Sequence, residues 1–267
     1  MRELERDPLP SPTDATLAIV GRGRVGSSLA RAAGRAGLEV ILAGREDAAE
    51  ACRSADLALL CVPDDAITSA CEALGEATPA LVGHVSGATE LTALEPAGRR
   101  GAAVLSMHPL QTFPDGETEI AGTPCAVAGS TPEALAFAAA LAERLGMRPF
   151  EVPEEHRDAY HAAAAKASNL LVALQESAAE LMERAGVEGA REILGPLVLR
   201  TAANWAERGP EALTGPIARG DEETVERHRA AIADLAPELL DSYDALAERA
   251  RAVADEREPA GGEGVRA

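Results

Sequence analysis

Short apolar runs alternate with longer stretches of helical periodicity along the chain as far as Glu151. The apolar runs are TLAIV from Thr16, ILA from Ile41, DLALLCV from Asp56, PALVGHV from Pro79, AAVLSMH from Ala102 and TPCAVAG from Thr123. Helical stretches such as SSLARAAGRAG and PEALAFAAALAERLG separate several of them. Apolar strands joined by crossover helices are typical of a parallel sheet covered on both faces. The pattern therefore predicts an α/β domain with a mainly parallel sheet.

Beyond Glu151 the strand pattern stops and the chain has helical periodicity to about Asp255. The first helix of this part is predicted to be long, from about Glu155 to Ala185, and later breaks stand at GVEG, RGPEALTGPIARGD and Ala236-Pro237. The predicted organisation is a disordered leader over residues 1–14, the α/β domain over 15–152, an all-helical domain over 153–255 and a disordered tail over 256–267.

A glycine-rich turn, GRGRVG, lies between the first predicted strand and the first predicted helix. Gly21, Gly23 and Gly26 form the pattern GxGxxG, with Arg24 and Val25 between the second and third glycines. In a strand–turn–helix setting these glycines allow a tight turn, close approach of a pyrophosphate and close packing of the helix. The helix N-terminus offers free amides to the phosphates. The turn therefore predicts a Rossmann-type dinucleotide-binding domain.

The end of the second predicted strand indicates which dinucleotide is bound. About twenty residues after the glycine turn, an NAD site places an acidic residue on the ribose. Here the strand ends in Ala43-Gly44-Arg45, with Glu46 following directly. An arginine at this place suits the 2′-phosphate of NADP through charge-assisted hydrogen bonds. NADP is the predicted cofactor, and NAD is the less favoured alternative because of Glu46.

The loop after the third predicted strand reads Val62-Pro63-Asp64-Asp65. Pro63 fixes the turn, and we expect Asp64 or Asp65 to cap the next helix. Because this loop stands at the carboxyl end of a strand, Val62, Pro63 and Asp64 are also predicted to contact the cofactor.

Two histidines follow the next two predicted strands. His84, with Ser86, follows the fourth strand, and His108 follows the fifth, where the active loops of such sheets lie. A histidine there can donate a proton or bind a carboxylate. His84 and Ser86 are predicted to bind substrate and His108 to take part in catalysis. The alternative for each histidine is a structural hydrogen bond to the backbone.

Lys166, on the predicted long helix, is the only lysine in the chain. An ammonium can give up its proton when it is desolvated, whereas a guanidinium cannot. A sole lysine in an alanine-rich helix therefore predicts a proton donor, and the structural alternative is a side chain that snorkels from a helix edge. Asn169 is predicted to lie on the same helix face, and His161 on an adjoining stripe is predicted to bind substrate.

The segment LTGPIARGDEETVERH contains one further predicted substrate contact. Arg219 stands in a glycine-flanked loop, where a guanidinium can clamp a carboxylate through two parallel hydrogen bonds. A structural ion pair is the alternative. Asp221 is predicted to be the N-cap of the following helix, with Thr224 in its first turn.

Six motifs together resemble a group of bacterial oxidoreductases that pair a Rossmann-like domain with an uncharacterised helical domain. They are GRGRVGSSLA, CVPDDAI, HVSGA, MHPLQTF, YHAAAAKASNLLVAL and LTGPIARGDEETVERH. The group is similar to the wider 6-phosphogluconate dehydrogenase-like superfamily, which includes β-hydroxyacid dehydrogenases, ketopantoate reductases and pyrroline-5-carboxylate reductase. The resemblance implies hydride transfer from NADPH to the carbonyl of a small oxo acid. The alternatives are an imine (C=N) reductase and a non-catalytic NADP-binding sensor.

The same resemblance implies roles for two residues of the helical region. In the β-hydroxyacid and ketopantoate enzymes, a lysine on the first long helix of the second domain protonates the substrate oxygen, and an asparagine one turn later holds the substrate. Lys166 and Asn169 match in residue type, although those enzymes commonly place the asparagine four residues on, where this chain has Leu170. His108 or His161 is the alternative proton donor. A homodimer through the helical domain is also implied.

Charge and composition exclude several classes of function. The net charge of −19 argues against binding to nucleic acid or an anionic membrane, so an anionic small substrate needs a local cluster of positive groups. The four cysteines lack paired CxxC spacing, which predicts reduced thiols rather than a metal site. No signal peptide or membrane span is expected, and a cytoplasmic location is predicted.

Overall fold

The computed structural model describes residues 11–12 and 14–257. These residues fall into two compact units, the first ending at Ser168 and the second beginning at Asn169. Most of the predicted leader and tail lies outside the described residues: of the leader, residues 11, 12 and 14 are described, and of the tail, residues 256 and 257, which continue the last helix.

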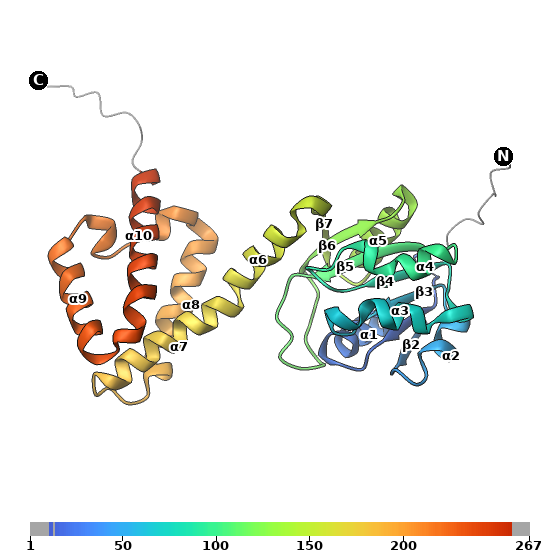
Figure 1. Cartoon of the computed structure of the whole chain (residues 1–267), viewed down its shortest axis with the longest axis horizontal. Coiled ribbons are helices and arrows are strands. Elements are labelled where there is room, and N and C mark those ends of the chain that lie inside the picture. The colour runs from blue at the N-terminus through green and yellow to red at the C-terminus, as the bar shows by residue number, and fades with distance from the viewer. Residues whose placement is uncertain (1–10, 13, 258–267) are drawn as a thin grey trace, which may run out of the picture. The chain divides into compact units, whose positions relative to one another are not determined.

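The first unit is built on a seven-stranded sheet with the strand order β2-β1-β3-β4-β5-β6-β7 (Figure 1). Every neighbouring pair is parallel except β5 and β6, which are antiparallel. The predicted mainly parallel α/β sheet is therefore confirmed. The strands are β1 (Leu17–Val20), β2 (Val40–Ala43), β3 (Leu57–Leu60), β4 (Leu81–His84), β5 (Ala103–Pro109), β6 (Pro124–Gly129) and β7 (Arg148–Glu151).

Helices cover both faces of this sheet, and successive strand residues point into two different cores. Ile19 packs in a cluster with Leu29 and Phe137, from the helices on one face, whereas Val20 packs in a second cluster with Ile67 from the other face. Central strands buried on both faces need apolar residues at every position, which explains the uninterrupted runs in the sequence. The helices are α1 (Arg24–Arg35) and α5 (Pro132–Arg144) on the first face, and α2 (Ala48–Arg53), α3 (Ile67–Ala73) and α4 (Glu95–Arg99) on the second.

The edge strand β7 is the part of the sheet that the apolar pattern does not predict. Its sequence is Arg-Pro-Phe-Glu, and both of its end residues are exposed. An edge strand has a neighbour on one side only, so it tolerates proline and charged residues and carries no continuous apolar signal.

The single long helix predicted from about Glu155 to Ala185 is wrong. The chain forms α6 (Arg157–Ala167) and α7 (Asn169–Arg184), and Ser168 between them has φ −124° and ψ −77°. The Ser168 hydroxyl donates to the carbonyl of Ala164 at 2.8 Å, a back-bond that often bends helices. Lys166 and Asn169 therefore stand on different helices, and the argument that placed them on one helix face is also wrong.

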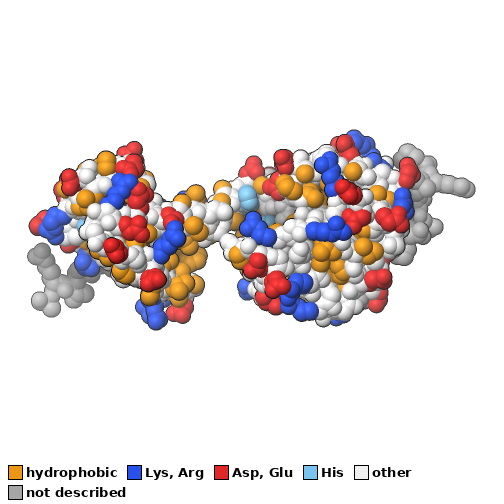
Figure 2. All heavy atoms as spheres, turned by 90° about the horizontal axis from the view of Figure 1, so that it is seen from below, with side chains coloured by type: hydrophobic (Ala, Val, Ile, Leu, Met, Phe, Trp, Pro, Cys, Tyr) orange, Lys and Arg blue, Asp and Glu red, His pale blue; other side chains and the backbone are white. Residues whose placement is uncertain are grey.

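The second unit contains only helices among its regular elements within the described range: α7, α8 (Ala190–Arg208), α9 (Glu222–Leu235) and α10 (Leu240–Arg257), with short 3₁₀ turns. The predicted N-cap of α9 is confirmed, because the Asp221 carboxylate accepts from the Thr224 N–H at 3.0 Å. Large apolar side chains on α7 and α8 remain exposed, and Figure 2 shows hydrophobic side chains gathered on the surface of this unit. None of the described helices combines the length and apolar character needed to cross a membrane.

Candidate functional site

The three glycines of the turn after β1 stand in different surroundings. A Cβ atom on Gly21, whose φ is +127°, would lie 2.1 Å from the Cys61 carbonyl oxygen, and one on Gly26 would lie 1.9 Å from the Gly21 carbonyl oxygen. A Cβ on Gly23 would meet nothing within 4 Å. The first and third glycines are thus required by packing within the protein. The second leaves the backbone open on its outer side, as close approach of a ligand requires.

The N-terminus of α1 has free hydrogen-bond donors at this turn. Gly23 is the N-cap and has no side chain to cap the helix. The first intrahelical bond runs from the Ser27 N–H to the Gly23 carbonyl at 2.9 Å, so the amides of Arg24, Val25 and Gly26 precede the helical ladder. Together with the helix dipole, such amides form a site for phosphate groups.

A cavity of about 270 Å³ lies beside the glycine turn. Four predicted cofactor contacts line it: Gly21, Arg45, Val62 and Pro63. Its remaining lining is small and mainly apolar: Val20, Ala48, Ala66, Ser69, Ala70 and Ala73. A mainly apolar cavity with a few polar groups at its edge is the usual form of a site for an aromatic ring, such as the base of a nucleotide.

The loop after β3 departs from the prediction in one respect. Asp64 and Asp65 are exposed and belong to a short 3₁₀ turn, Asp64–Ala66. The N-cap residues here are Pro63 for the turn and Ala66 for α3, and neither helix start has a side-chain cap. The expectation that Asp64 or Asp65 caps a helix is therefore wrong, because the extra 3₁₀ turn places both aspartates inside a helical segment rather than before one.

A charged cluster that the sequence reading missed adjoins Arg45. The Asp47 carboxylate accepts from the Gly44 N–H at 2.6 Å and forms an ion pair with Arg22 of the glycine turn. Burial raises the pKa of this carboxyl, but the backbone N–H groups of Gly44 and Asp47 and the Arg22 guanidinium together hold it below its usual range. Arg45 is exposed and, within the described part of the chain, makes no ion pair. Its guanidinium is thus available to an anion at the cavity.

His84, the last residue of β4, is completely buried. Its Nδ1 accepts from the Ser86 N–H at 3.2 Å, so the neutral ring carries its proton on Nε2. Burial lowers the pKa of His84 to about 4, and the nearby Arg157 guanidinium adds to this effect, against the opposing influence of the Glu90 backbone. The burial and the Nδ1 bond fit a structural histidine, whereas the buried Nε2 has no hydrogen-bond partner among the described residues. Its predicted contact with substrate stays a prediction.

His108, near the end of β5, is only half-buried and meets a tyrosine. Its Nδ1 lies 2.7 Å from the Tyr160 hydroxyl of α6, and the His161 ring lies near it, with 6.2 Å between ring centroids. Burial lowers the pKa of His108 to about 4, with smaller contributions from His161 and Arg157. A Cβ on Gly87 would lie 2.7 Å from the His108 Cε1, so the imidazole rests directly against the backbone of the loop after β4. At neutral pH His108 is therefore an uncharged, well-fixed ring.

Tyr160 is a functional candidate that sequence reasoning missed. Burial raises the pKa of its hydroxyl to about 12, and the Cys125 thiol contributes in the same direction. Phe150 of β7 packs against its ring, with 5.9 Å between centroids. The available signal was its rarity, because the chain has only two tyrosines and this one directly precedes His161.

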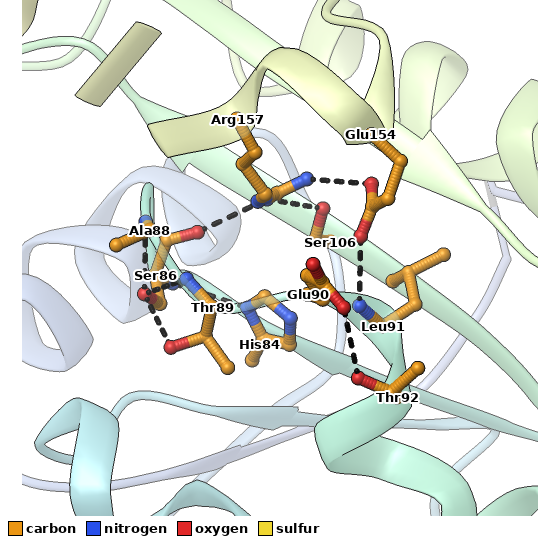
Figure 3. A network of polar contacts seen from close by, with 10 residues as sticks. All are labelled: His84, Ser86, Ala88, Thr89, Glu90, Leu91, Thr92, Ser106, Glu154 and Arg157. Atoms are coloured by element: carbon orange, nitrogen blue, oxygen red, sulfur yellow. Dashed lines mark hydrogen bonds and ion pairs between the residues drawn. The ribbon is translucent and has the colours of Figure 1, made fainter. Parts of the chain in front are cut away.

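Arg157, also missed, is buried beside Ser86 and Ser106, with only 4% of its surface exposed (Figure 3). Its guanidinium donates to the Ser86 carbonyl at 3.2 Å and to the Ser106 hydroxyl at 2.8 Å, and pairs with Glu154 at 3.3 Å. The other carboxylate oxygen of Glu154 accepts from the Leu91 N–H at 3.0 Å. No signal in the sequence separates Arg157 from the other arginines.

Three further predicted site residues do not lie with His108, Tyr160 and Arg157 in the first unit. Lys166 is exposed on α6, two turns beyond Tyr160. Asn169 begins α7 and belongs to the second unit. Arg219, also in the second unit, is exposed and lines an open cavity of about 760 Å³ with Gly215 and Gly220. The roles assigned to all three stay predictions.

Two family descriptions match parts of the sequence. Residues 43–109 match a Rossmann-like domain, and residues 123–250 match a domain of unknown function, DUF2520. The pairing agrees with the resemblance drawn from the motifs. No curated protein sequence matches the chain significantly.

Solved structures of similar fold cover nearly the whole chain. A Bacteroides fragilis protein described provisionally as an NADP oxidoreductase is 24% identical, with a TM-score of 0.72 over 91% of this chain and 100% of its own. A Thermotoga maritima protein is 23% identical, with a TM-score of 0.73 over 90% and 99%. A Plasmodium falciparum pyrroline carboxylate reductase with NADP bound is 15% identical, with a TM-score of 0.61 over 91% and 99%. At these identities the likeness shows the fold.

Proposed function

We propose that the protein is an NADP-dependent oxidoreductase that reduces the carbonyl group of a small oxo acid. The observation that carries the proposal is the arrangement at one edge of the sheet. The carboxyl ends of parallel strands β1, β3, β4 and β5 hold both the glycine turn with its cavity and the uncharged His108–Tyr160 pair. A nucleotide site and a proton-donating pair at the same edge are what hydride transfer to a carbonyl requires.

The glycine turn and its surroundings fit a dinucleotide. The open backbone at Gly23 and the first amides of α1 would bind the pyrophosphate, and the cavity between Gly21 and Pro63 would hold the adenosine. Arg45, without an ion-pair partner among the described residues, would bind a 2′-phosphate. When bound, the reduced nicotinamide supplies the hydride, and the protein's residues supply orientation and the proton. The NADP complex of the Plasmodium falciparum structure supports the same choice of cofactor.

Tyr160 is the proton donor that this geometry favours. A hydroxyl with a pKa of about 12 holds its proton at neutral pH and can release it to a developing alkoxide, which is more basic. The neutral His108 ring would donate from Nδ1 to the phenolate oxygen that results, and the phenolate would recover a proton from solvent. The product is the alcohol: hydride on carbon and the tyrosine proton on oxygen. Lys166 is the alternative donor, although it is exposed on α6.

Imine reduction is the second candidate, favoured by the structural similarity to a pyrroline carboxylate reductase. A C=N substrate that is already protonated needs no proton on oxygen, so Tyr160 would then orient the substrate only. A panel of small oxo acids and cyclic imines, followed by NADPH absorbance, separates the two reactions. If only imines are reduced, the carbonyl proposal fails. If neither class is turned over although NADPH binds tightly, the protein is a sensor.

Arg45→Ala tests the cofactor assignment by binding alone. Loss of a charge-assisted contact of about 1.5–3 kcal/mol should weaken NADP binding about 10- to 100-fold and leave NAD binding unchanged. Arg53→Ala is the matched control, because Arg53 is an exposed arginine on the neighbouring α2, paired with Glu50. Isothermal titration with each nucleotide gives the ratio, and an unchanged NADP-to-NAD ratio would overturn the assignment.

Tyr160→Phe tests the proton donor once a substrate is found. The kcat should fall about 100-fold, the usual scale of general acid catalysis, with little change in NADP affinity. Lys166→Ala is the matched comparison. If Lys166→Ala abolishes turnover while Tyr160→Phe retains it, the proton comes from Lys166.

A homodimer through the helical unit is also proposed. Several apolar side chains on α7 and α8 are more than half exposed: Leu170, Val172, Leu197, Leu199 and Trp205 among them. An exposed apolar surface of this kind marks an interaction site, and a second copy offers a chemically matching surface. Leu197→Glu with Leu199→Glu should convert a dimer to a monomer in sedimentation experiments. A monomeric parent protein would overturn the proposal.

A further inference from the structure

We propose that Arg157 is the positioning residue of this site: its guanidinium joins α6, β5 and the loop after β4, and thereby sets the Tyr160 hydroxyl against the His108 ring. The inference deepens the proposed function, since it rests on the His108–Tyr160 pair as the reacting site. Three segments meet at that pair, and Arg157 belongs to one of them, α6, and is hydrogen-bonded to the other two.

On the helix side, Arg157 fixes the start of α6. It is the first residue of the helix, and Tyr160 lies three positions further on, on the same helix face. Glu154, just before the helix, accepts from the Leu91 N–H and pairs with Arg157, which ties this end of α6 to the segment after β4. Movement of the first turn of α6 would therefore move the Tyr160 hydroxyl directly.

On the sheet side, Arg157 fixes both surfaces that hold the imidazole. Ser106, which accepts from Arg157, precedes His108 by two residues on β5, so the two side chains point to the same face of the sheet. The Ser86 carbonyl, the other acceptor, belongs to the loop whose Gly87 backbone lies against the His108 ring. Ser86 also closes that loop on itself, because its hydroxyl accepts from the N–H groups of Ala88 and Thr89 (Figure 3).

The burial of Arg157 is costly, which argues against a role in stability alone. A buried guanidinium loses its hydration, and its one carboxylate partner, Glu154, is itself 39% exposed. Within the described residues the Arg157 Nε has no hydrogen-bond partner. An apolar side chain of similar volume at such a place is often neutral or stabilising. A charged side chain at this place is explained if its hydrogen bonds hold α6, β5 and the loop after β4 in fixed positions.

The charge of Arg157 also acts on the ring that it positions. His108 is surrounded by Arg157, Tyr160 and His161 from α6, by Asp64 after β3 and by His84 of β4, with Cys125 of β6 beside Tyr160. Of these, Arg157 and His161 oppose protonation of His108, and Asp64 favours it. Removing the guanidinium should thus raise the pKa of His108, because one of the two groups that oppose its protonation is gone.

The experiment is an NMR titration of the histidine rings, which is practical because the chain has five histidines. In folded Arg157→Met the pKa of His108 should rise above about 4 but stay below the ordinary 6.5, because burial, the larger cause of the shift, remains. Arg99→Met is the matched control, because Arg99 also pairs with a nearby preceding glutamate, Glu95, but is exposed, and it should leave His108 unchanged. An unchanged pKa of His108 in folded Arg157→Met would overturn the electrostatic half of the proposal.

Arg157→Lys distinguishes the effect of the hydrogen bonds from the effect of the charge. It also provides a test if Arg157→Met does not fold. Lysine keeps the charge but lacks the fork that reaches Ser86, Ser106 and Glu154 together. The pKa of Tyr160 should then fall from about 12 towards 10 as its hydroxyl leaves the buried contact, observed by ultraviolet titration in a Tyr243→Phe background. A Tyr160 pKa that stays near 12 in Arg157→Lys would overturn the positioning role.

These readouts need neither cofactor nor turnover, so they remain informative if the proposed oxidoreductase activity fails. With a substrate in hand, Arg157→Lys should lower kcat about 100-fold, as expected for a small misplacement of reacting groups, while the KM for NADPH stays near that of the parent. If the parent and Arg157→Lys have equal kcat values, Arg157 has no role in catalysis. This conclusion holds even if Tyr160 is confirmed as the acid.

Discussion

The glycine turn and the His108–Tyr160 pair lie at the same edge of one sheet, but they are built in opposite ways. The turn is a contiguous stretch of six residues whose requirements are steric and lie in the backbone. The pair is assembled from β5 and α6, 52 residues apart, and its requirements are burial and charge. A local site of the first kind leaves a motif in the sequence. A site of the second kind leaves residues that gain their meaning only when the chain is folded.

Alanine substitutions in the turn should show the largest effect and test the steric side of the comparison. Gly21→Ala and Gly26→Ala each bring a Cβ within about 2 Å of a carbonyl oxygen, which should lower the free energy of unfolding by about 3 kcal/mol. Gly23→Ala is the control, because its Cβ meets nothing within 4 Å. Its free energy of unfolding in urea should equal that of the parent, and only its affinity for NADP should fall. Equal losses of stability in all three variants would remove the distinction between the glycines.

Lowering the pH tests the role of charge at the His108–Tyr160 pair. Its effect on the free energy of unfolding should be the next largest. His84 and His108 have folded pKa values of about 4, below the ordinary 6.5, so the unfolded chain binds more protons between these values. Stability is therefore present above about pH 6.5 and is lost as the pH falls towards 4. From about pH 7 to about pH 5.5 the loss should be about 2 kcal/mol in urea unfolding.

One variant assigns part of that pH dependence to His108. His108→Asn should remove roughly half of the slope, since one of the two shifted histidines is gone. A slope that persists in full in His108→Asn would place the titrating groups elsewhere.

Ser86→Ala should have a smaller effect and tests how far the loop after β4 depends on its own hydrogen bonds. The hydroxyl accepts from Ala88 and Thr89 at 3.2 and 3.0 Å, and its loss should cost about 1–1.5 kcal/mol. Thermal unfolding measures this directly. Ser177→Ala is the control: Ser177 donates to a helix carbonyl on the exposed surface of α7, so its removal should be close to neutral.

The smallest effect is expected at the surface of α1. Arg31 and Glu117 form an ion pair in which both side chains are about half exposed or more, so Glu117→Gln should change the free energy of unfolding by less than about 0.5 kcal/mol. Added salt should abolish the difference. A cost comparable to that of Ser86→Ala would show that surface charge, and not the steric fit of the glycines, organises the neighbourhood of the turn.

Much of the fold follows from the sequence, because the central strands are buried on both faces and must be apolar throughout. The edge strand β7 and the break at Ser168 do not follow from the sequence. Each depends on the packing of neighbouring residues, which the periodicity of the sequence does not identify. Ser168 itself carries no strong helix-breaking signal, and the helical pattern continues on both sides of it.

The parts of the site that are made of residues close together in sequence are the parts that the sequence predicts best. Gly21 of the glycine turn, Arg45, and Val62 and Pro63 after β3 line one cavity, and their role in binding a cofactor stays a prediction. The position of His108 at a strand end makes it a candidate from the sequence alone, whereas nothing in the spacing links it to its partner Tyr160. The bonds of Arg157 to Ser106 and Ser86 span 51 and 71 residues, and a guanidinium in an arginine-rich chain gives no indication of burial. Contacts over such separations depend on tertiary packing, which sequence spacing does not encode.

The exposure of Lys166 has a practical consequence for chemical labelling. Since it is the sole lysine and its side chain is accessible on α6, an amine-reactive dye meets a single lysine ammonium in the whole chain. Aside from the chain's own α-amino group, no other amine competes for the reagent. A fluorophore on this lysine, close along the helix to the boundary at Ser168, would report on a known position without any cysteine engineering.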